Sequence, residues 1–512
     1  ETLVPFCFPK SAWAAVSMVA IEMAGGAFVP LDPSAPAARI QGILDDVQAK
    51  LVVCSPQNEA MLKQLGVNTL AVTESMIKKL PDPASPVTSS VNPDGACFVI
   101  FTSGSTGTPK GLVMEHGSVA TSAKAIGQRL GLSSEVRMLQ FAAFVFDLSI
   151  GEIFGPLTHG GCLCIPSDQD RLNDITGYIN KTKVNWMYLT PAFARTIDPA
   201  DVPTVELLVF AGEAVGRDVF EQWFGKVRLV NGWGPAETCC YSSIHEFKSI
   251  DESPLTIGRP VGGLGWIVEP GNPTRLAPTG TIGELVIQGP TLLREYLADP
   301  DRTAEAILSD LPEWAPRRDD GHFNRFYLSG DLCSYNANGQ IEYFNRKDTQ
   351  VKIRGLRIEL GEVEHHVKMN IPEARQVAVD VFESQSGTHL AAYFCSTDAG
   401  RVAGAQTTYD DMFTDIDSEL RGALLAVHSK MSVALPAYMV PTLFIPCKYM
   451  PTVTSSKLDR SVLRKHSAKL TQERINQFSL LQGEKRAPET PMEARMQAFW
   501  AILSRPFART GC

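Results

Sequence analysis

The sequence lacks the features that mark several common protein classes. Its 512 residues include 11 cysteines, and no two of them form a CxxC pair. A zinc site built on such pairs is therefore not expected. An odd number of cysteines in a long chain also argues against a disulfide framework. We expect reduced thiols, as in a cytoplasmic protein.

Excess positive charge and long apolar runs are also missing. The chain has 47 Lys and Arg against 56 Asp and Glu, a net charge of −9, which argues against nucleic acid or an anionic membrane as the main partner. The apolar stretch from Ala12 to Val29 is interrupted by Glu22 and Gly25-Gly26, so it is a poor membrane span. No signal peptide is evident. We expect no nucleic-acid partner and no membrane association.

What is present is an alternation of short apolar strands with helices up to about residue 290, followed by shorter strands and turns. This pattern predicts an α/β fold with a large N-terminal domain of mixed, largely parallel sheets flanked by helices. A smaller, mobile α+β domain is expected at the C-terminal side. The predicted boundaries are 1–347 for the large domain, 348–467 for the small domain and 468–512 for a linker and the start of a carrier-like segment.

The segment "FTSGSTGTPKG", residues 101–111, directly follows an apolar run that is typical of a buried strand. Glycines let a backbone approach an anion, hydroxyls add donors, and Lys110 adds a positive charge, so the segment predicts a phosphate-binding loop. It does not fit the GxxxxGK[ST] pattern, and Pro109 interrupts any simple helix after it. We therefore expect a loop that closes over phosphates.

Three other segments combine turn residues with one chemically useful side chain. "NGWGPAET" at 231–238 offers Trp233 for stacking on a purine and Glu237 for Mg²⁺. "YLSGDL" at 327–332 places Asp331, a possible acceptor for ribose hydroxyls, beside a glycine turn. "SSKLDR" at 455–460 places Lys457 in a turn. Each segment alone is weak, because a packed tryptophan or a solvated lysine would look the same.

The order of the segments is more specific. The series "FTSGSTGTPKG", "FDLS", "NGWGPAET", "GELVIQGP", "YLSGDL", "RKDTQVKIRGLRIELGEVE", "LPAYMVP" and "SSKLDR" resembles the core motifs of adenylate-forming enzymes. That superfamily includes acyl-CoA synthetases, luciferases and the adenylation domains of nonribosomal peptide synthetases. "RGLRIELGEVE" and "LPAYMVP" resemble the peptide-synthetase branch, of fungal type. The resemblance covers about Ala24 to Arg460.

The resemblance implies a reaction in two halves. A carboxylate attacks the α-phosphate of ATP to give an acyl-adenylate and pyrophosphate, and the acyl group then passes to a phosphopantetheine thiol on a separate carrier domain. ATP and Mg²⁺ are the implied cofactors, with Glu237 as the metal ligand, Lys457 as the catalytic residue and Asp348 as the hinge. The implied nucleotide-binding residues are Thr102, Ser103, Gly104, Ser105, Thr106, Gly107, Lys110, Trp233, Gly234, Glu237, Asp331, Tyr343 and Arg346.

The resemblance also implies where an amino acid binds. Asp147 of "FDLS" would pair with an α-ammonium group, since a buried carboxylate needs a cation. The implied pocket is lined by Leu148, Gly151, Tyr188, Val209, Ala211, Gly232, Cys240 and Tyr241. None is charged and three are small, so we expect a bulky neutral side chain: aromatic, large aliphatic, or modified, such as an acylated hydroxyornithine of a siderophore. A small substrate stays open, because the tyrosines themselves can fill a pocket.

Some features depart from the family pattern. Ala236 replaces a usual threonine, and the first family motif does not precede "ETLVPFCFPK", so a truncated large domain is expected. "PETPMEARMQAFWAIL" resembles the first helix of a carrier domain without its phosphopantetheine site. The expected partners are the amino acid and the peptidyl carrier and condensation domains of a parent synthetase of secondary metabolism. The alternatives are an acyl- or aryl-CoA ligase of the same superfamily, or an inactive scaffold domain.

Overall fold

The computed structural model describes residues 1–81, 91–104, 109–318, 321, 323–348, 350–353, 355–371, 373–384, 387–396, 400–402, 412–452 and 458–480. The chain groups into two compact units. Unit 1 holds Glu1–Ile371 with Ser429–Val440, and unit 2 holds Pro372–His428 with Pro441–Cys512. Residues 348–371 thus group with unit 1. The expected hinge at Asp348 and the expected boundary at 467 stay predictions.

The first sheet of unit 1 has seven strands in the order β17-β6-β5-β2-β1-β3-β4. Strands β4, β3, β1, β2 and β5 run parallel to their neighbours, whereas β6 and β17 add antiparallel edges. The strands are β1 (Thr2–Cys7), β2 (Gly26–Pro30), β3 (Leu51–Cys54), β4 (Asn68–Ala71), β5 (Ala96–Thr102), β6 (Lys110–Glu115) and β17 (Glu295–Tyr296).

The second sheet of unit 1 has 13 strands in the order β15-β14-β16-β19-β20-β13-β12-β11-β10-β9-β7-β8, with β18 on β19. It is parallel from β8 to β11 and antiparallel beyond β11. The strands are β7 (Arg137–Leu139), β8 (Cys162–Cys164), β9 (Trp186–Leu189), β10 (Leu207–Ala211), β11 (Arg228–Trp233), β12 (Ser243–Glu246), β13 (Thr256–Pro260), β14 (Leu264–Glu269), β15 (Asn272–Leu276), β16 (Gly283–Gln288), β18 (Ile307–Leu308), β19 (Phe326–Tyr335) and β20 (Ile341–Arg346).

Helices of unit 1 pack their apolar faces on these sheets. In α1 (Ala12–Met23) the buried residues Ala14, Met18 and Ile21 recur at helical spacing and join the same core cluster as β5. The others are α2 (Ala37–Asp46), α3 (Pro56–Gln64), α4 (Glu74–Ile77), α5 (His116–Leu130), α6 (Leu148–Thr158), α7 (Asp168–Asn173), α8 (Ile175–Thr182), α9 (Pro191–Ala194), η1 (Pro199–Asp201), α10 (Arg217–Trp223), η2 (Ala236–Thr238), α11 (Pro300–Ala306) and α12 (Leu360–Asn370). α5 and α6 lie against each other.

A two-stranded hairpin of unit 1, β21 (Gln350–Ile353) with β22 (Leu356–Glu359), immediately precedes α12. Its tip carries Gly355, whose φ of +76° is a backbone conformation that glycine adopts without steric cost. The Gly355 amide donates to the Glu213 carboxylate at 2.6 Å, which anchors the hairpin tip to the segment after β10.

Unit 2 is built on a three-stranded sheet in the order β23-β24-β26. Ala378, Tyr393, Ile445 and Phe478 belong to its core cluster. The strands are β23 (Gln376–Ser384), β24 (Gly387–Cys395) and β26 (Leu443–Pro446), with β25 (Gly400–Val402) and β27 (Met450–Thr452) as a separate pair. Its helices are α14 (Arg460–Ser467) and α15 (Gln472–Phe478), while α13 (Ser418–Ala434) begins in unit 2 and ends in unit 1, and η4 (Ala437–Met439) belongs to unit 1.

The predicted fold class is confirmed: the chain is α/β, with parallel strands and flanking helices in its N-terminal part. The apolar run before the Gly-rich segment forms β5, as its composition indicated. Of the helices in the described part of the chain, none combines the length and the apolar character needed to cross a membrane.

Candidate active site

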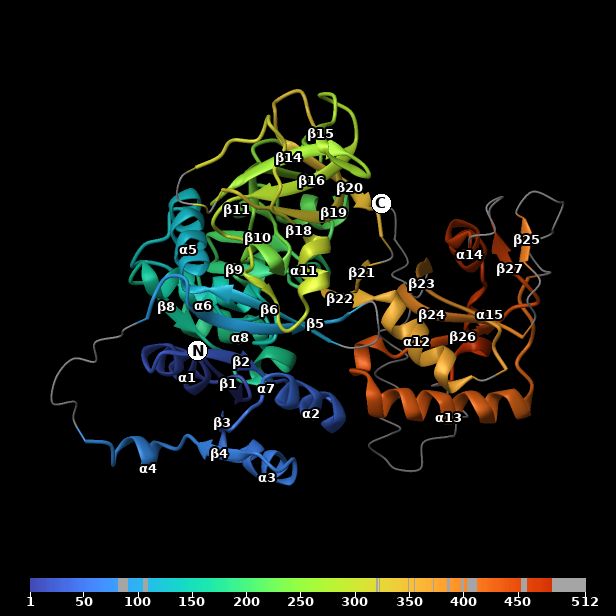
Figure 1. The fold of residues 1–512 in the computed structure, drawn as a ribbon, viewed down its shortest axis with the longest axis horizontal. Coiled ribbons are helices and arrows are strands. Elements are labelled where there is room, and N and C mark those ends of the chain that lie inside the picture. Colours follow the sequence, from blue (N-terminus) through green and yellow to red (C-terminus); the bar gives the residue numbers. More distant parts are fainter. Residues whose placement is uncertain are drawn as a thin grey trace, which may run out of the picture. The chain divides into compact units, whose positions relative to one another are not determined.

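The Gly-rich segment connects two neighbouring antiparallel strands. Thr102, the last residue of β5, pairs with Lys110, the first residue of β6, and the two strands lie side by side in Figure 1. The Ser103 hydroxyl donates to the Arg357 carbonyl at 3.2 Å and accepts from the Glu359 amide at 3.3 Å. The predicted phosphate-binding residues Ser105, Thr106 and Gly107 lie outside the described residues.

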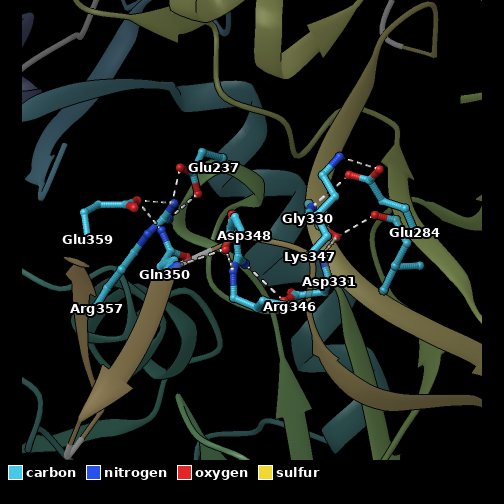
Figure 2. A network of polar contacts seen from close by, with 12 residues as sticks. Glu237, Glu284, Gly330, Asp331, Arg346, Lys347, Asp348, Gln350, Arg357 and Glu359 are labelled. Carbon is cyan, nitrogen blue, oxygen red and sulfur yellow. Dashed lines mark hydrogen bonds and ion pairs between the residues drawn. The ribbon is translucent and has the colours of Figure 1, made fainter. Parts of the chain in front are cut away.

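Glu237 is the centre of a buried charge cluster, shown in Figure 2. Its carboxylate is fully buried and accepts from Arg357 at 3.0 and 2.9 Å, from Lys110 at 3.3 Å and from the Tyr296 hydroxyl at 2.8 Å. Burial alone would raise the pKa of Glu237, but Arg357 and Lys110 hold that pKa well below its usual range. The group is therefore an ionised carboxylate, the form that a hard metal cation requires.

Two other predicted nucleotide residues, Trp233 and Arg346, contact Asp331 on β19. Its carboxylate accepts from the Trp233 indole at 3.1 Å and from the Arg346 guanidinium at 3.0 Å. Arg346 also pairs with Asp348 at 2.8 and 2.6 Å, as Figure 2 shows. Burial raises the pKa of Asp331, and Arg346 opposes that rise. The arrangement fixes the carboxylate from two sides.

Glycine and a second carboxylate hold Asp331 in place. The preceding residue, Gly330, has a φ of +74°, and a Cβ there would lie 2.8 Å from the Arg346 guanidinium. Its amide donates to Glu284 at 3.1 Å, and Glu284 also accepts from Lys347 at 2.6 Å. Glu284 thus ties β16 to β19 directly beside the Asp331 carboxylate (Figure 2).

Most of the residues predicted to line the amino-acid pocket lie on β9, on β10 and in the segment after β11. Tyr188 and Tyr241 are buried, with ring centroids 5.4 Å apart at 69°. Neither hydroxyl has a hydrogen-bond partner among the described residues. Gly232 lies under the Tyr241 ring, where a Cβ would come within 2.6 Å. The residues that share one core cluster are Tyr188, Val209, Ala211, Cys240 and Tyr241, with Leu148 packed against it.

A small cavity adjoins two of the predicted pocket residues. This cavity, of about 20 Å³, adjoins Gly151 and Cys240 and continues between α5 and α6 past Ile126 and Phe154. It has room for about one water molecule. This cavity is too small for a bulky side chain, and the expectation of a large neutral substrate stays a prediction.

Asp147 is the N-cap residue of α6. Burial raises the pKa of its carboxyl to about 6, and the charge of Lys352 on β21 opposes the rise. Lys352 opposes the raised pKa of Asp331 as well. The Lys352 ammonium group therefore lies near both Asp147, which is predicted to bind the amino acid, and Asp331, which is predicted to bind the ribose.

The nucleotide segment and the pocket share one stretch of backbone. A side chain on Gly234 would collide with the carbonyl of Cys240. Cys239 and Cys240 both have positive φ, at 62° and 72°. The chain thus folds back tightly between Glu237 and Tyr241, which only a glycine at 234 permits.

Sequence reasoning missed several residues of this region. Tyr296 and Arg357 contact Glu237 from 59 and 120 residues away, and no local pattern marks them for that role. A buried network was also missed: Lys10 donates to Gln140 at 2.7 Å, and Gln140 donates to Glu152 at 2.8 Å. Glu152 follows Gly151 in α6, so this network fixes the helix that lines the pocket.

Other predicted residues lie apart from these contacts or outside the described part. Tyr343, on β20, packs against the main core of unit 1. The Gly104 amide donates to Glu362 at 3.1 Å. Lys457 lies outside the described residues, so its predicted catalytic role stays a prediction.

Comparison with known proteins adds independent information. Residues 1–297 match the family model described as AMP-binding enzyme. The chain is 40% identical over 515 residues to nonribosomal peptide synthetase atnA of Emericella nidulans, covering 98% of this chain and 7% of atnA. It is 38% identical over 517 residues to N-benzoylphenylalaninol synthetase apmA of Penicillium brevicompactum, covering 99% of this chain and 21% of apmA. The chain therefore spans a small part of each of these relatives.

Solved structures agree on the fold. The adenylation domain AlmE of Vibrio cholerae, in complex with glycyl-adenosine-5'-phosphate, superposes with a TM-score of 0.72 at 22% identity, covering 92% of this chain and 89% of that one. The fused adenylation–PCP di-domain NpsA-ThdA from Klebsiella oxytoca gives 0.68 at 23% identity, covering 87% and 83%.

Proposed function

Because the chain belongs to the AMP-binding enzyme family, it is an ATP-dependent ligase that forms AMP, and we propose that it activates an α-amino acid for nonribosomal peptide synthesis. The amino-acid carboxylate attacks the α-phosphorus of ATP, the bond to the β-phosphate oxygen breaks, and pyrophosphate leaves. The aminoacyl-adenylate then loses AMP to the phosphopantetheine thiol of a carrier domain, with a thioester as product.

One observation carries this proposal: side chains from separate motifs form hydrogen bonds and ion pairs with one another inside unit 1. Lys110 of the Gly-rich segment contacts Glu237 at 3.3 Å, and Trp233 contacts Asp331 at 3.1 Å. Phosphoryl transfer depends mainly on positioning and charge neutralisation. A cluster of Lys110, Arg357 and an ionised carboxylate supplies both next to a predicted phosphate loop.

Magnesium fits the donor set at Glu237. Mg²⁺ is usually held by one or two carboxylates together with phosphates and water, and Glu237 is a single ionised carboxylate beside Lys110. The ion would neutralise charge on the phosphates. Arg357 occupies both carboxylate oxygens of Glu237, so Glu237 would hold the ion with a different position of the Arg357 side chain.

In the proposed complex, Asp331 accepts hydrogen bonds from the ribose hydroxyls while Trp233 and Arg346 hold it in position. Asp147 pairs with the α-ammonium group, and Lys457 places its charge between the substrate carboxylate and the α-phosphate. The substrate is a bulky neutral or modified amino acid. The reaction takes place in the cytoplasm, with the carrier and condensation domains of a larger synthetase as partners.

The test is amino-acid-dependent ATP–pyrophosphate exchange across a panel that includes Gly, Asp, aromatic, aliphatic and acylated hydroxyornithine substrates. We expect exchange with one bulky neutral member and none without an amino acid. Greatest exchange with Gly or Asp would refute the substrate class, and no exchange with any member would refute activation. Offering CoA or a phosphopantetheinylated carrier as acceptor then separates the proposed reaction from that of a CoA ligase.

Glu237→Gln is the informative variant, with Glu246→Gln as its control. Gln keeps the shape of the side chain but removes the charge for the metal, so exchange should fall by about 10²–10³-fold, the usual loss when one electrostatic contact to a transition state is removed. Glu246 is an ion-pair partner of Arg228 and Lys248 at the other end of β12. Its variant should keep full exchange.

A further inference from the structure

Three side chains with metal-binding atoms come together away from the Glu237 cluster. Glu22 lies near the end of α1, Cys97 lies on β5, and His116 is the first residue of α5. Their ligand atoms (a carboxylate oxygen, Sγ and an imidazole nitrogen) all lie within 4.8 Å of one another. The three residues come from three separate elements, which explains why no CxxC-type spacing marks them.

The surroundings of the cluster are those of a built site. The Cys97 side chain is 1% exposed, and its thiol donates to Glu22 at 2.8 Å. Glu22 is the only charged residue of α1, whose other residues are apolar or small. A carboxylate facing a buried thiol from an otherwise apolar helix needs a compensating charge or hydrogen bond.

His116 completes the set without being used elsewhere. Its imidazole has no hydrogen-bond partner among the residues that the structure describes, while its backbone amide is bonded to the Gly95 carbonyl at 3.0 Å. Gly95 also lies beside the ring, where a Cβ would be 3.8 Å from it. The ring is therefore positioned by its backbone and keeps a nitrogen free for coordination.

We propose that Glu22, Cys97 and His116 bind one Zn²⁺ ion. Zinc accepts mixed sulfur, nitrogen and oxygen ligands, and sites with three protein ligands complete their coordination with water. One thiolate and one carboxylate together carry two negative charges, which a divalent cation neutralises. On binding, an Sγ–Zn bond forms and the thiol proton passes to solvent.

The geometry requires only a small contraction. Ligand atoms around tetrahedral zinc lie roughly 3.3–3.8 Å apart, given bond lengths of about 2.0–2.3 Å. The ligand atoms, now within 4.8 Å of one another, would have to move together by about 1 Å through side-chain rotation. The Glu22 carboxylate and the Cys97 sulfur are already 2.8 Å apart. The ion would connect α1, β5 and α5. Of these, β5 is the strand that leads into the Gly-rich segment.

The test uses the whole chain, stripped of metal with a chelator, kept reduced, and titrated with Zn²⁺ or Co²⁺. Co²⁺ reports a thiolate ligand by a near-ultraviolet charge-transfer band and tetrahedral geometry by its visible bands. We expect one equivalent of either metal to bind and zinc to raise the melting temperature, because it binds only the folded chain.

Variants distinguish a specific metal site from non-specific metal binding by other thiols. Cys97→Ala should remove the charge-transfer band, and Glu22→Gln and His116→Gln should each weaken binding by at least ~10–100-fold. Cys162→Ala, at an exposed cysteine, should change neither. Circular dichroism checks that each variant is folded, and the two ligand variants that keep Cys97 test the site even if Cys97→Ala does not fold.

Two outcomes would overturn the proposal: no metal bound at one equivalent, or a band that survives in Cys97→Ala and disappears in Cys162→Ala. Neither outcome bears on amino-acid activation, since pyrophosphate exchange is read separately.

Discussion

Gly151→Ala should destabilise the chain when residue 240 is cysteine and stabilise it when residue 240 is alanine. In the native chain, a Cβ at 151 would lie 2.5 Å from the Cys240 Sγ, a contact that must be relieved by movement in a buried region. Overpacking of this kind costs about 1–3 kcal/mol. Gly→Ala within a helix gains about 0.8–1.0 kcal/mol, so we expect a net loss of roughly 0–2 kcal/mol.

In a Cys240→Ala background the clash is gone. The next atoms are the Cβ of residue 240 at 3.7 Å and the Tyr188 ring at 3.8 Å, both ordinary contacts. Gly151→Ala should then raise the free energy of unfolding by about 0.8–1.0 kcal/mol. The coupling energy between the two sites is therefore about 1–3 kcal/mol, a size usual for residues in direct contact. Chemical denaturation of the four chains, followed by tryptophan fluorescence, measures it.

Gly155→Ala in the same helix is the matched control. A Cβ there meets only the Leu132 side chain, at 3.5 Å, so its effect should be the same in both backgrounds. Equal effects of Gly151→Ala with and without the sulfur would refute the reasoning, and with it the claim that Cys240 limits this side of the pocket. Pyrophosphate exchange on the same chains shows whether the limit acts on substrate: Gly151→Ala should raise KM for the amino acid, and Cys240→Ala should restore it.

Three further predictions concern the reacting groups. Trp233→Phe removes the indole donor to Asp331; a hydrogen bond to a charged group is worth about 1.5–3 kcal/mol, so KM for ATP in the exchange assay should rise about 10–100-fold, and an unchanged KM would contradict the assigned role. Asp147 has a pKa raised to about 6, and only its ionised form pairs with an ammonium group; kcat/KM for the amino acid should therefore fall below pH 6, and the residual activity of Asp147→Asn should lack that limb. Lys457→Ala should fold normally, judged by circular dichroism, yet lose exchange by about 10²–10³-fold; retained exchange would exclude its catalytic role.

The sequence was sufficient for much of the fold because strand and helix signals are local. The run "ACFVIF" is apolar on both faces and forms β5, buried between β2 and β6. The apolar stretch from Ala12 to Val29, judged a poor membrane span, divides into α1 and β2 around Gly25. Trp233 and Asp331 were named from separate motifs, and the structure joins them by a hydrogen bond.

What the sequence could not supply are contacts that depend on tertiary packing. Arg357 reaches Glu237 because hydrogen bonds with Ser103 and Glu213 hold the hairpin β21–β22 in place, and nothing in its own neighbourhood indicates that partner. The size of the pocket depends on how the Tyr188 and Tyr241 rings pack, at 69° to each other. Side-chain identity gives the volume of a residue but not the direction in which it points.

The tight return of the backbone at Gly234 and Cys240 has a consequence for redesign. Cys240, predicted to line the amino-acid pocket, is three positions from the carboxylate expected to hold the metal, and its carbonyl leaves room only for a glycine at 234. Grafting a relative's pocket by exchanging residues 240 and 241 alone would leave this contact mismatched. A chimera should instead take the whole stretch 231–241 from one parent, since the residues predicted to contact the substrate and those predicted to contact the nucleotide share this stretch of chain.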